Sequence, residues 1–258
     1  MNGKVKSIDR ALDILEAFSE QKTELSITEL SKILRMKTST VHRILTTLKE
    51  REYIKQSSPK AKYKLGIKAF ELGCIFRSQM HFTKIAMPYL RYLCNLTKET
   101  THLAILDDSS AEVIYIAQVA SPEPLRTAVG VGTRWRAHCT AIGKVLLAFL
   151  PQEKIEQMFL NQRKLPTYTP NSISDVNELK RHLKKVRTQG FAIDNEEFGM
   201  GIRCLGAPIR DDNGKVIAAV SIAGPATRFS KEKAEELKGT IMNVCNEMSS
   251  ELGFKEIE

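Results

Sequence analysis

Several features that define whole classes of proteins are missing from this sequence of 258 residues. Its five cysteines include no CxxC pair, so neither a disulfide framework nor a zinc site is predicted. No apolar run is long enough to cross a membrane, and the N-terminal segment lacks the apolar stretch of a signal peptide. No phosphate-binding glycine loop, HExxH or GxSxG motif occurs. These absences predict a protein of the reducing cytoplasm with no membrane partner, no metal and no cofactor.

Acidic residues are scarce in one stretch of the chain. Between Lys32 and Lys68 there are eleven Lys and Arg side chains, and the acidic ones are Glu50 and Glu52 alone. This window carries a formal charge of +9, whereas the basic and acidic residues of the remaining chain cancel. A cationic segment within an otherwise neutral protein indicates a local binding site for a polyanion.

Two helices are predicted toward the N-terminus, mostly ahead of this basic window. The first covers residues 7–18, where Ile8, Leu12, Leu15 and Phe18 recur at helical spacing. The second opens with Ser26 and Glu29, the S-x-x-E pattern of a capping box, and should end near residue 34.

A third helix is predicted from about residue 38, with Thr38 or Ser39 as its N-cap. Its apolar stripe, which should enter a core, consists of Val41, Ile44, Leu45 and Leu48. The opposite face carries short hydroxyl residues, His and Arg, where an ordinary solvated helix carries Glu and Lys. An ordinary solvated face is the alternative interpretation.

Two short helices joined by a tight turn are typical of the helix-turn-helix unit, whose second helix enters the major groove by its N-terminal residues. We therefore expect contacts with the phosphates and base edges of duplex DNA from the turn and the polar face of the third helix. The candidates are Arg35, Lys37, Thr38, Ser39, Thr40, His42, Arg43 and Thr46.

A basic two-stranded ribbon is predicted directly after this helix. The turn cluster at residues 57–60 separates two short strand patterns, and the second alternates as "KYKL". Lys60 and Lys62 are expected to contact phosphates from this wing. A hairpin that only increases solubility is the alternative.

The rest of the chain predicts an α/β (α+β) layer with an antiparallel sheet. Strand patterns cover residues 101–107, 112–120 and 124–130, and Asn213-Gly214 between two apolar strands indicates a hairpin. Helical patterns cover residues 139–150, residues 175–189 before Gly190, and residues 230–252. Such a domain suits either an enzyme or a small-molecule sensor.

Two groups of motifs resemble the IclR family of bacterial transcription regulators. The segments "SIDRALDILEAF", "LSITELSKILRMKTSTVHRILTTLKEREYI" and "YKLG" resemble its N-terminal half. The segments "HCTAIGKVLLAFL" and "GFAIDNEEFGMGIRCLGAPIRDDNGKVIAAVSIAGPATR" resemble its effector-binding half. The match covers nearly the whole chain in the expected order.

The resemblance implies a winged helix-turn-helix domain (1–68), a linker helix (69–82) and a GAF-like effector-binding and oligomerisation domain (83–258). It implies a homodimer or homotetramer on operator DNA, with repression among the family's modes of action. By motif position, the residues that would face the effector are Trp135, Ala141, Ile142, Asp194, Ile202, Cys204, Ser221 and Ala223. The chain departs from the family at Trp135-Arg136-Ala137, where an apolar-Pro-apolar pattern is common.

We expect the effector to be a small organic anion, favouring a hydroxy- or keto-acid. Backbone N–H groups at the start of the 140–150 helix would bind its carboxylate, with added charge from Arg136. The apolar helix around Phe70, Cys74 and Phe76 is the candidate dimer seam, and packing of this helix on its own second domain is the alternative.

A competing hypothesis is an enzyme of small-acid metabolism that carries a basic nucleic-acid-binding module. Its nucleophile would be Cys139 or Cys204 and its base His138, because a reactive cysteine needs a neighbouring base and a lowered thiol pKa. The purely structural alternatives are core packing for Trp135 and Cys204, a capping or core role for His138, and a surface position for Asp194. A purely architectural DNA binder would not need the second domain.

Overall fold

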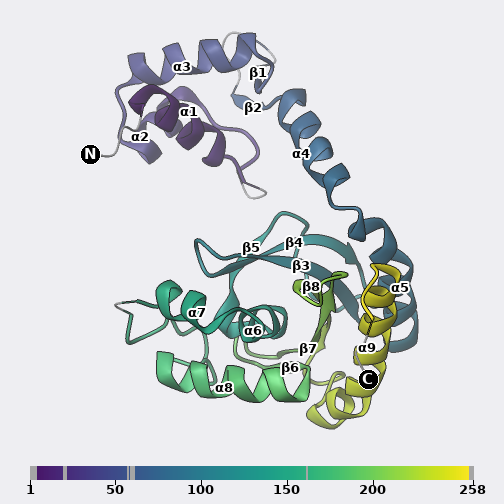
Figure 1. Cartoon of the computed structure of the whole chain (residues 1–258). Coiled ribbons are helices and arrows are strands. Elements are labelled where there is room, and N and C mark those ends of the chain that lie inside the picture. Colours follow the sequence, from purple (N-terminus) through teal and green to yellow (C-terminus); the bar gives the residue numbers. More distant parts are fainter. Residues whose placement is uncertain (1–4, 20–21, 57, 59–61, 161, 256–258) are drawn as a thin grey trace. The chain divides into compact units, whose positions relative to one another are not determined.

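A computed structural model describes residues 5–19, 22–56, 58, 62–160 and 162–255 of the chain (Figure 1). The chain divides into two compact units, residues 1–81 and residues 82–258. Each unit has its own hydrophobic core, and the two are considered separately below.

Unit 1 is a helix-turn-helix followed by a two-stranded ribbon and a further helix. Its elements are α1 (Lys6–Glu16), α2 (Ile27–Leu34), α3 (Thr38–Glu50), β1 (Ile54–Gln56), β2 (Tyr63–Leu65) and α4 (Ile67–Gln79). Strands β1 and β2 pair antiparallel, as the wing predicts. The predicted stripe of α3 is in the core, since Val41, Leu45 and Leu48 are buried and Ile44 is half-buried.

The N-cap residues of the unit 1 helices were predicted correctly for α2 and wrongly for α3, although α3 begins at Thr38 as expected. Ser26 Oγ accepts the Glu29 N–H at 3.2 Å while Glu29 Oε2 accepts the Ser26 N–H at 2.7 Å, which confirms the capping box. The N-cap of α3 is Lys37, which makes no side-chain capping bond, so Thr38 and Ser39 are already helical. Arg35, the C-cap of α2, has a left-handed φ of 51°. The tight turn that follows leads directly into α3 at Thr38, one residue earlier than a cap at Thr38 would allow.

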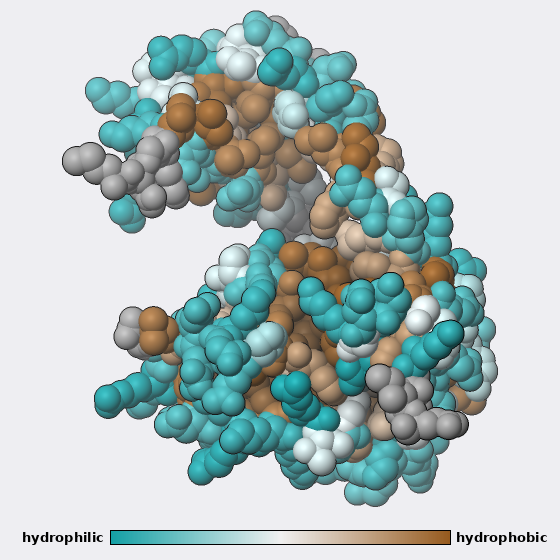
Figure 2. All heavy atoms as spheres, viewed as in Figure 1, coloured by the Kyte–Doolittle hydropathy of each residue, from teal (hydrophilic) through white to brown (hydrophobic). Residues whose placement is uncertain are grey.

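The apolar residues of α1 are only partly buried. Ile14 is fully buried, but Ile8 and Leu12 are 59% and 50% exposed. Helix α4 has no buried residue in the described chain, and Phe70 is 66% exposed. Figure 2 shows apolar side chains at the surface of unit 1. The small core of unit 1 therefore leaves several apolar side chains of α1 and α4 exposed to solvent.

Unit 2 is a six-stranded antiparallel sheet with helices on both faces, which confirms the predicted fold class. The strand order is β5-β4-β3-β8-β7-β6. The strands are β3 (Thr100–Asp107), β4 (Glu112–Val119), β5 (Arg134–Arg136), β6 (Ala192–Asn195), β7 (Ile202–Arg210) and β8 (Val216–Pro225). Helices α5 (Phe82–Thr97) and α9 (Lys231–Glu251) pack against the sheet together, as Figure 1 shows.

The other face of the sheet holds the short helices. They are η1 (Ala137–Cys139), α6 (Ala141–Ala148), α7 (Gln152–Met158) and α8 (Val176–Gln189). Helix α6 lies on the sheet and α8 packs against α6. Helix α8 ends at Gly190, as predicted, because that residue adopts a left-handed φ of 79°.

The prediction of a strand over residues 124–130 was wrong. This segment is an irregular loop between β4 and β5, and β4 pairs instead with residues 134–136. Pro122 and Pro124 have no N–H to offer to a strand ladder, which disfavours pairing at the start of the segment. The Asn213-Gly214 hairpin between β7 and β8 is confirmed, with Gly214 at a φ of +75°.

Candidate DNA-binding face and ligand cavity

The polar face of α3 is open to solvent along its first turns. Thr38, Ser39, His42 and Arg43 are exposed and Thr40 is half-buried. A helix start presents N–H groups without intrahelical partners together with the positive end of the helix dipole. The face therefore combines short hydroxyl side chains with a local positive potential, which suits an approaching phosphate.

The cations of this face are uncommitted in the part of unit 1 that the structure describes. Arg35, Lys37 and Arg43 are exposed and form no ion pair there. Thr46 is less free, because its hydroxyl donates to the His42 carbonyl oxygen at 3.0 Å. Its oxygen therefore keeps an acceptor role only.

The wing differs from the α3 face because its described lysines have acidic partners. Lys62 Nζ lies 3.1 Å from Glu29 Oε1, and Lys64 Nζ lies 3.6 Å from Glu24 Oε1. Hydrogen bonds from Ser26, and then from Lys62, lower the pKa of Glu29 to about 2, so this carboxylate is charged. The positive charge of Lys62 is thus partly compensated, which the sequence did not reveal. Lys60 lies outside the described residues.

One cavity in unit 2 is lined by all eight residues that the family resemblance placed at the effector. They come from β5, α6, β6, β7 and β8, and they are Trp135, Ala141, Ile142, Asp194, Ile202, Cys204, Ser221 and Ala223. The empty space, including the mouth, is about 650 Å³. This size is within the range of small-molecule sites.

Two glycines allow close packing at the start of α6, Gly206 against the sheet and Gly143 against η1. A Cβ atom at Gly206 in β7 would lie 3.1 Å from the Ala141 carbonyl carbon and 3.2 Å from the Ile142 nitrogen. A Cβ atom at Gly143 would lie only 2.2 Å from the Ala137 carbonyl oxygen. Thr140 caps the helix by accepting the Gly143 N–H at 3.0 Å. The N–H groups of Ala141 and Ile142, which have no intrahelical partner, are therefore held at the cavity wall.

Asp194 is the acidic residue of the cavity. Its Oδ1 accepts the Glu197 N–H at 2.8 Å, whereas its Oδ2 is buried without a partner among the described residues. Burial raises the pKa of Asp194 to about 7, against the opposing attraction of Lys144. Lys144 is fully buried, donates to the Ile193 carbonyl at 2.6 Å and pairs with Glu197. This carboxyl group can therefore hold a proton near neutral pH.

Neither Cys139 nor Cys204, the two candidate nucleophiles, is activated by its surroundings. Burial raises the pKa of the Cys139 thiol to about 12 and that of Cys204 well above its usual value. Cys139 Sγ donates to the Arg136 carbonyl at 3.2 Å, and the His138 Nε2 lies 2.9 Å from the Pro166 carbonyl oxygen. A thiol that stays protonated is a poor nucleophile, so the enzyme hypothesis lacks the thiolate that it requires.

The expectation that Arg136 adds charge to the site was wrong. Arg136 is exposed and does not line the cavity; its Nε lies 3.6 Å from Glu112 Oε1. Its neighbour Arg134 pairs with Asp107 at 2.6 Å. Side chains alternate along β5, so Trp135 faces the cavity while the flanking arginines face away. None of the residues lining the cavity is a Lys or an Arg.

Several lining residues were not identified from the sequence. His102 in β3, Tyr115 in β4, Thr127 in the β4–β5 loop and Phe198 after β6 all contribute to the wall. The Phe198 and Trp135 rings meet edge to face with centroids 4.3 Å apart. A histidine within the apolar run "THLAIL" was the available signal for His102, because strand alternation places it on the same face as Ala104.

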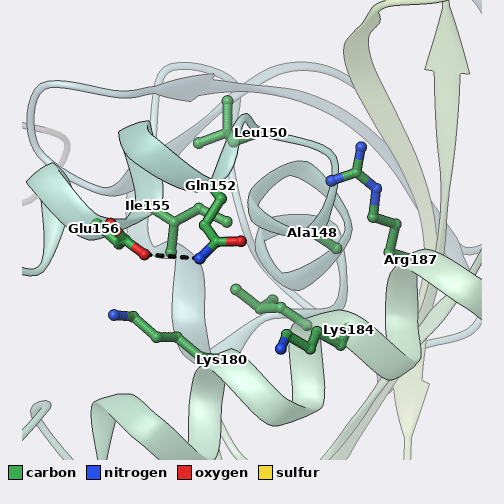
Figure 3. Close-up of a pocket in the computed structure, with 9 residues that line it drawn as sticks. Ala148, Leu150, Gln152, Ile155, Glu156, Lys180, Lys184 and Arg187 are labelled. Atoms are coloured by element: carbon green, nitrogen blue, oxygen red, sulfur yellow. Dashed lines mark hydrogen bonds between the residues drawn. The ribbon is translucent and has the colours of Figure 1, made fainter.

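A second concavity lies between α7 and α8 (Figure 3). Lys180, Lys184 and Arg187 rim an apolar floor that includes Ala148 and Ile155. The amide of Gln152 donates to Glu156 Oε1 at 2.8 Å across its edge. None of the predicted site residues is found there.

Two searches of the described residues bear on other classes of function. No described helix is long and apolar enough to cross a membrane. No cluster of three or more His, Cys, Asp or Glu side chains suited to a metal ion occurs in the described part of the chain.

A helix-turn-helix with an exposed cationic face, together with a separate unit that encloses a cavity, defines a ligand-responsive DNA-binding regulator. Comparison with known proteins agrees. Residues 7–58 match the IclR helix-turn-helix domain, and residues 76–250 match the bacterial transcriptional regulator IclR C-terminal domain. The chain belongs to the IclR family of bacterial transcription regulators, whose members are not enzymes but bind operator DNA and small-molecule effectors.

Individual relatives show the extent of the similarity. The HTH-type transcriptional regulator KdgR of Dickeya chrysanthemi is 37% identical over 98% of this chain and 81% of its own length. The crystal structure of the Thermotoga maritima IclR superposes with a TM-score of 0.76 at 31% identity, covering 96% of this chain and 99% of that one. An IclR homolog from Microbacterium hydrocarbonoxydans complexed with 4-hydroxybenzoate shares the fold, with a TM-score of 0.84 at 22% identity over 95% and 98% of the two chains.

Proposed function

We propose that this regulator binds a small organic acid in the unit 2 cavity and that binding changes its affinity for operator DNA bound by unit 1. The supporting observation is that residues from five separate elements, chosen by motif alone, surround a single cavity. A ligand alters DNA binding only through its different affinity for the DNA-binding and non-binding states. Since its target is genomic DNA, the regulator would work in the cytoplasm.

The proposed ligand is a hydroxy- or keto-acid. The N–H groups of Ala141 and Ile142 at the start of α6, with the helix dipole behind them, suit a carboxylate. The charged form of Asp194 would repel that carboxylate, so Asp194 has to be protonated or to accept a ligand hydroxyl. An acid that also carries a hydroxyl or keto oxygen satisfies both sides of the cavity.

Calorimetry with a panel of small carboxylates tests the ligand, using the wild type and the variants Ser221→Ala and Asp194→Ala. We expect binding by the wild type and a loss of affinity in both variants. Binding of neutral or cationic compounds with no binding of any carboxylate would contradict the organic acid. Unchanged affinity in both variants would place the site elsewhere in the chain.

In unit 1, we propose that duplex DNA meets the turn and first turns of α3, with the wing beside them. The support is the exposure of Thr38, Ser39, His42 and Arg43 together with the uncommitted charges of the turn. Contacts with phosphates would position the protein, and contacts with base edges would specify the operator. Binding of DNA fragments from upstream of the gene, measured by fluorescence anisotropy, tests this placement.

We also propose that the protein is a homo-oligomer, a dimer or a dimer of dimers. One recognition helix reads few base pairs, and helix-turn-helix proteins pair half-sites about one helical turn apart. Phe70 and Phe76 of α4 are 66% and 55% exposed, and with half-buried Cys74 they form the candidate seam. Sedimentation at micromolar concentration should show at least a dimer. A monomer at every concentration would exclude the seam.

A further inference from the structure

Four residues of the unit 2 cavity have buried polar atoms that no described group satisfies. They are both ring nitrogens of His102, Thr127 Oγ1, Trp135 Nε1 and Asp194 Oδ2. Nearly all buried polar groups in proteins are hydrogen-bonded, and a buried group without a partner destabilises the fold. Four such residues around one cavity indicate a ligand with several hydrogen-bonding groups.

His102 is the most demanding of the four because both of its nitrogens lack partners. It is 2% exposed and is the third residue of β3, with Thr101 before it and Leu103 after it. Its ring meets that of Tyr115 edge to face at 5.2 Å, a contact that an apolar ring would make equally well. Packing therefore does not account for a histidine at this position.

The ring of His102 is neutral near physiological pH. Burial lowers its pKa to about 4, and none of the residues that line the cavity is a cation. A neutral imidazole offers one N–H donor and one acceptor nitrogen. A hydroxyl group likewise donates once and accepts, whereas a carboxylate only accepts. The ring thus suits a ligand hydroxyl better than the carboxylate.

The register of the sheet separates His102 from the start of α6. His102 is paired with Ser221 of β8, and Ser221 is paired with Gly206 of β7, the residue beneath Ala141 and Ile142. Two strand spacings of about 4.8 Å each therefore lie between His102 and the N–H groups that suit a carboxylate. A ligand that reaches both has its hydroxyl several bonds away from its carboxylate.

We infer that His102 is an effector-binding residue that selects a hydroxyl distant from the carboxylate, so that the effector is a small acid with a distal hydroxyl. This inference rests on the proposed function of the cavity. Thr127 and Trp135 add donors on the same side of the site, and Asp194 faces the ligand from β6. An acid whose hydroxyl is adjacent to the carboxylate would leave the His102 nitrogens unsatisfied.

The experiment compares matched acids on the full-length protein. The probes are 4-hydroxybutyrate, butyrate and 2-hydroxybutyrate in an aliphatic set, and 4-hydroxybenzoate, benzoate and 2-hydroxybenzoate in an aromatic set. Binding is measured by calorimetry and by the fluorescence of Trp135, the single tryptophan of the chain. We expect the wild type to prefer the distal hydroxy acid of at least one set by about tenfold or more.

The variants are His102→Leu, which removes both nitrogens, and His102→Gln, which keeps a donor and an acceptor. The leucine variant should lose the preference for the distal hydroxyl while its affinity for the acid without a hydroxyl is unchanged or higher. The glutamine variant should retain part of the preference. The ligand-free leucine variant should melt no lower than the wild type, whereas a purely structural histidine predicts a lower melting temperature.

Each other outcome overturns the inference. An equal preference in wild type and His102→Leu, with both proteins folded by circular dichroism, excludes His102 while leaving the proposed function intact. A preference for the 2-hydroxy acids overturns the distal hydroxyl alone. If no acid binds the wild type, both the inference and the organic-acid proposal fail. If His102→Leu does not fold, the result with His102→Gln decides: a folded variant whose preference for the distal hydroxyl is reduced supports the role, an unchanged preference overturns it, and unfolding of both variants assigns His102 to structure.

Discussion

The two candidate sites of this protein are built in opposite ways. The candidate DNA-binding face of α3 is an exposed helix surface, and its cations have no partner in the described part of unit 1, so a ligand from solvent can reach them. The unit 2 cavity is enclosed, has no cation in its wall and contains buried polar atoms that lack partners. The first site uses charge that water screens, and the second uses hydrogen bonds that burial strengthens. Mutations should therefore act by different physics in the two sites.

The largest expected effect is the loss of stability of unit 2 on replacing Lys144 by Met. Lys144 is fully buried and pairs with Glu197, so the variant leaves a buried carboxylate without its cation. Breaking such a pair costs about 3–5 kcal/mol. Urea unfolding followed by Trp135 fluorescence reports unit 2, which contains the single tryptophan.

The matched control is Lys154→Met, which removes an exposed partner of Asp108. Exposed pairs contribute about 0–1 kcal/mol, so this variant should unfold like the wild type. Equal unfolding midpoints for the two variants would show that the buried pair is no more important than the exposed one.

The second effect concerns the α3 face. Arg43→Ala should weaken operator binding by about 1–3 kcal/mol if the arginine makes a good base contact. Lys49→Ala removes another exposed cation, from the last turn of the same helix, and should have a smaller effect, because the N-terminal residues of a recognition helix reach the base edges. Anisotropy titrations of both variants on one operator fragment compare them. Equal losses would indicate a purely electrostatic surface.

The third effect is a pH dependence of effector binding that the DNA-binding face should not share. Asp194 has a pKa of about 7 in the folded protein, and its surroundings include Lys144 from α6, Glu197 and the Cys204 thiol from β7. A carboxylate ligand favours the protonated form of Asp194. Its affinity should therefore fall as the pH rises through 7, by up to about tenfold per pH unit. Calorimetry between pH 6 and 8 measures this, and Asp194→Asn should flatten the profile. A flat wild-type profile would contradict it.

Asp194 should also make the free energy of unfolding of the ligand-free protein depend on pH. In the unfolded chain Asp194 loses its proton near the ordinary pKa of 3.8, whereas the folded protein keeps it until about 7. The contribution of Asp194 to stability is therefore complete below pH 3.8 and is lost as the pH rises toward 7. Urea midpoints of the wild type should decline relative to those of Asp194→Asn across this interval. Parallel profiles would show that Asp194 ionises normally.

The smallest expected effect is that of Lys62→Ala in the wing. Lys62 already pairs with Glu29, so its contribution to phosphate binding is partly offset. Lys55 of β1 is exposed and forms no ion pair among the described residues, so Lys55→Ala is the informative comparison. The slope of log affinity against log salt should change less for Lys62→Ala than for Lys55→Ala, and by well under one unit. A full unit for Lys62→Ala would show that DNA displaces Glu29.

The sequence by itself determined the local features of this protein. The capping box at Ser26, the buried stripe of α3, the stop at Gly190 and the Asn213-Gly214 hairpin depend on neighbouring residues, so a short window predicts them. The eight cavity residues were found through family motifs, which is a different kind of information from physical periodicity. The basic window was visible because charge is counted without knowing the fold.

Tertiary structure decided which residues meet. It paired Lys62 with Glu29, turned Arg136 away from the cavity, made the 124–130 segment a wall in place of a strand, and brought His102 beside the other unsatisfied polar groups. The Lys62–Glu29 ion pair and the position of His102 join segments far apart in the chain, where no local pattern fixes the distance, whereas the orientation of Arg136 follows from side-chain alternation once β5 is paired with β4. The pKa of Asp194 belongs to the same group, because burial is a property of the whole packed unit and not of the residues beside it in the sequence.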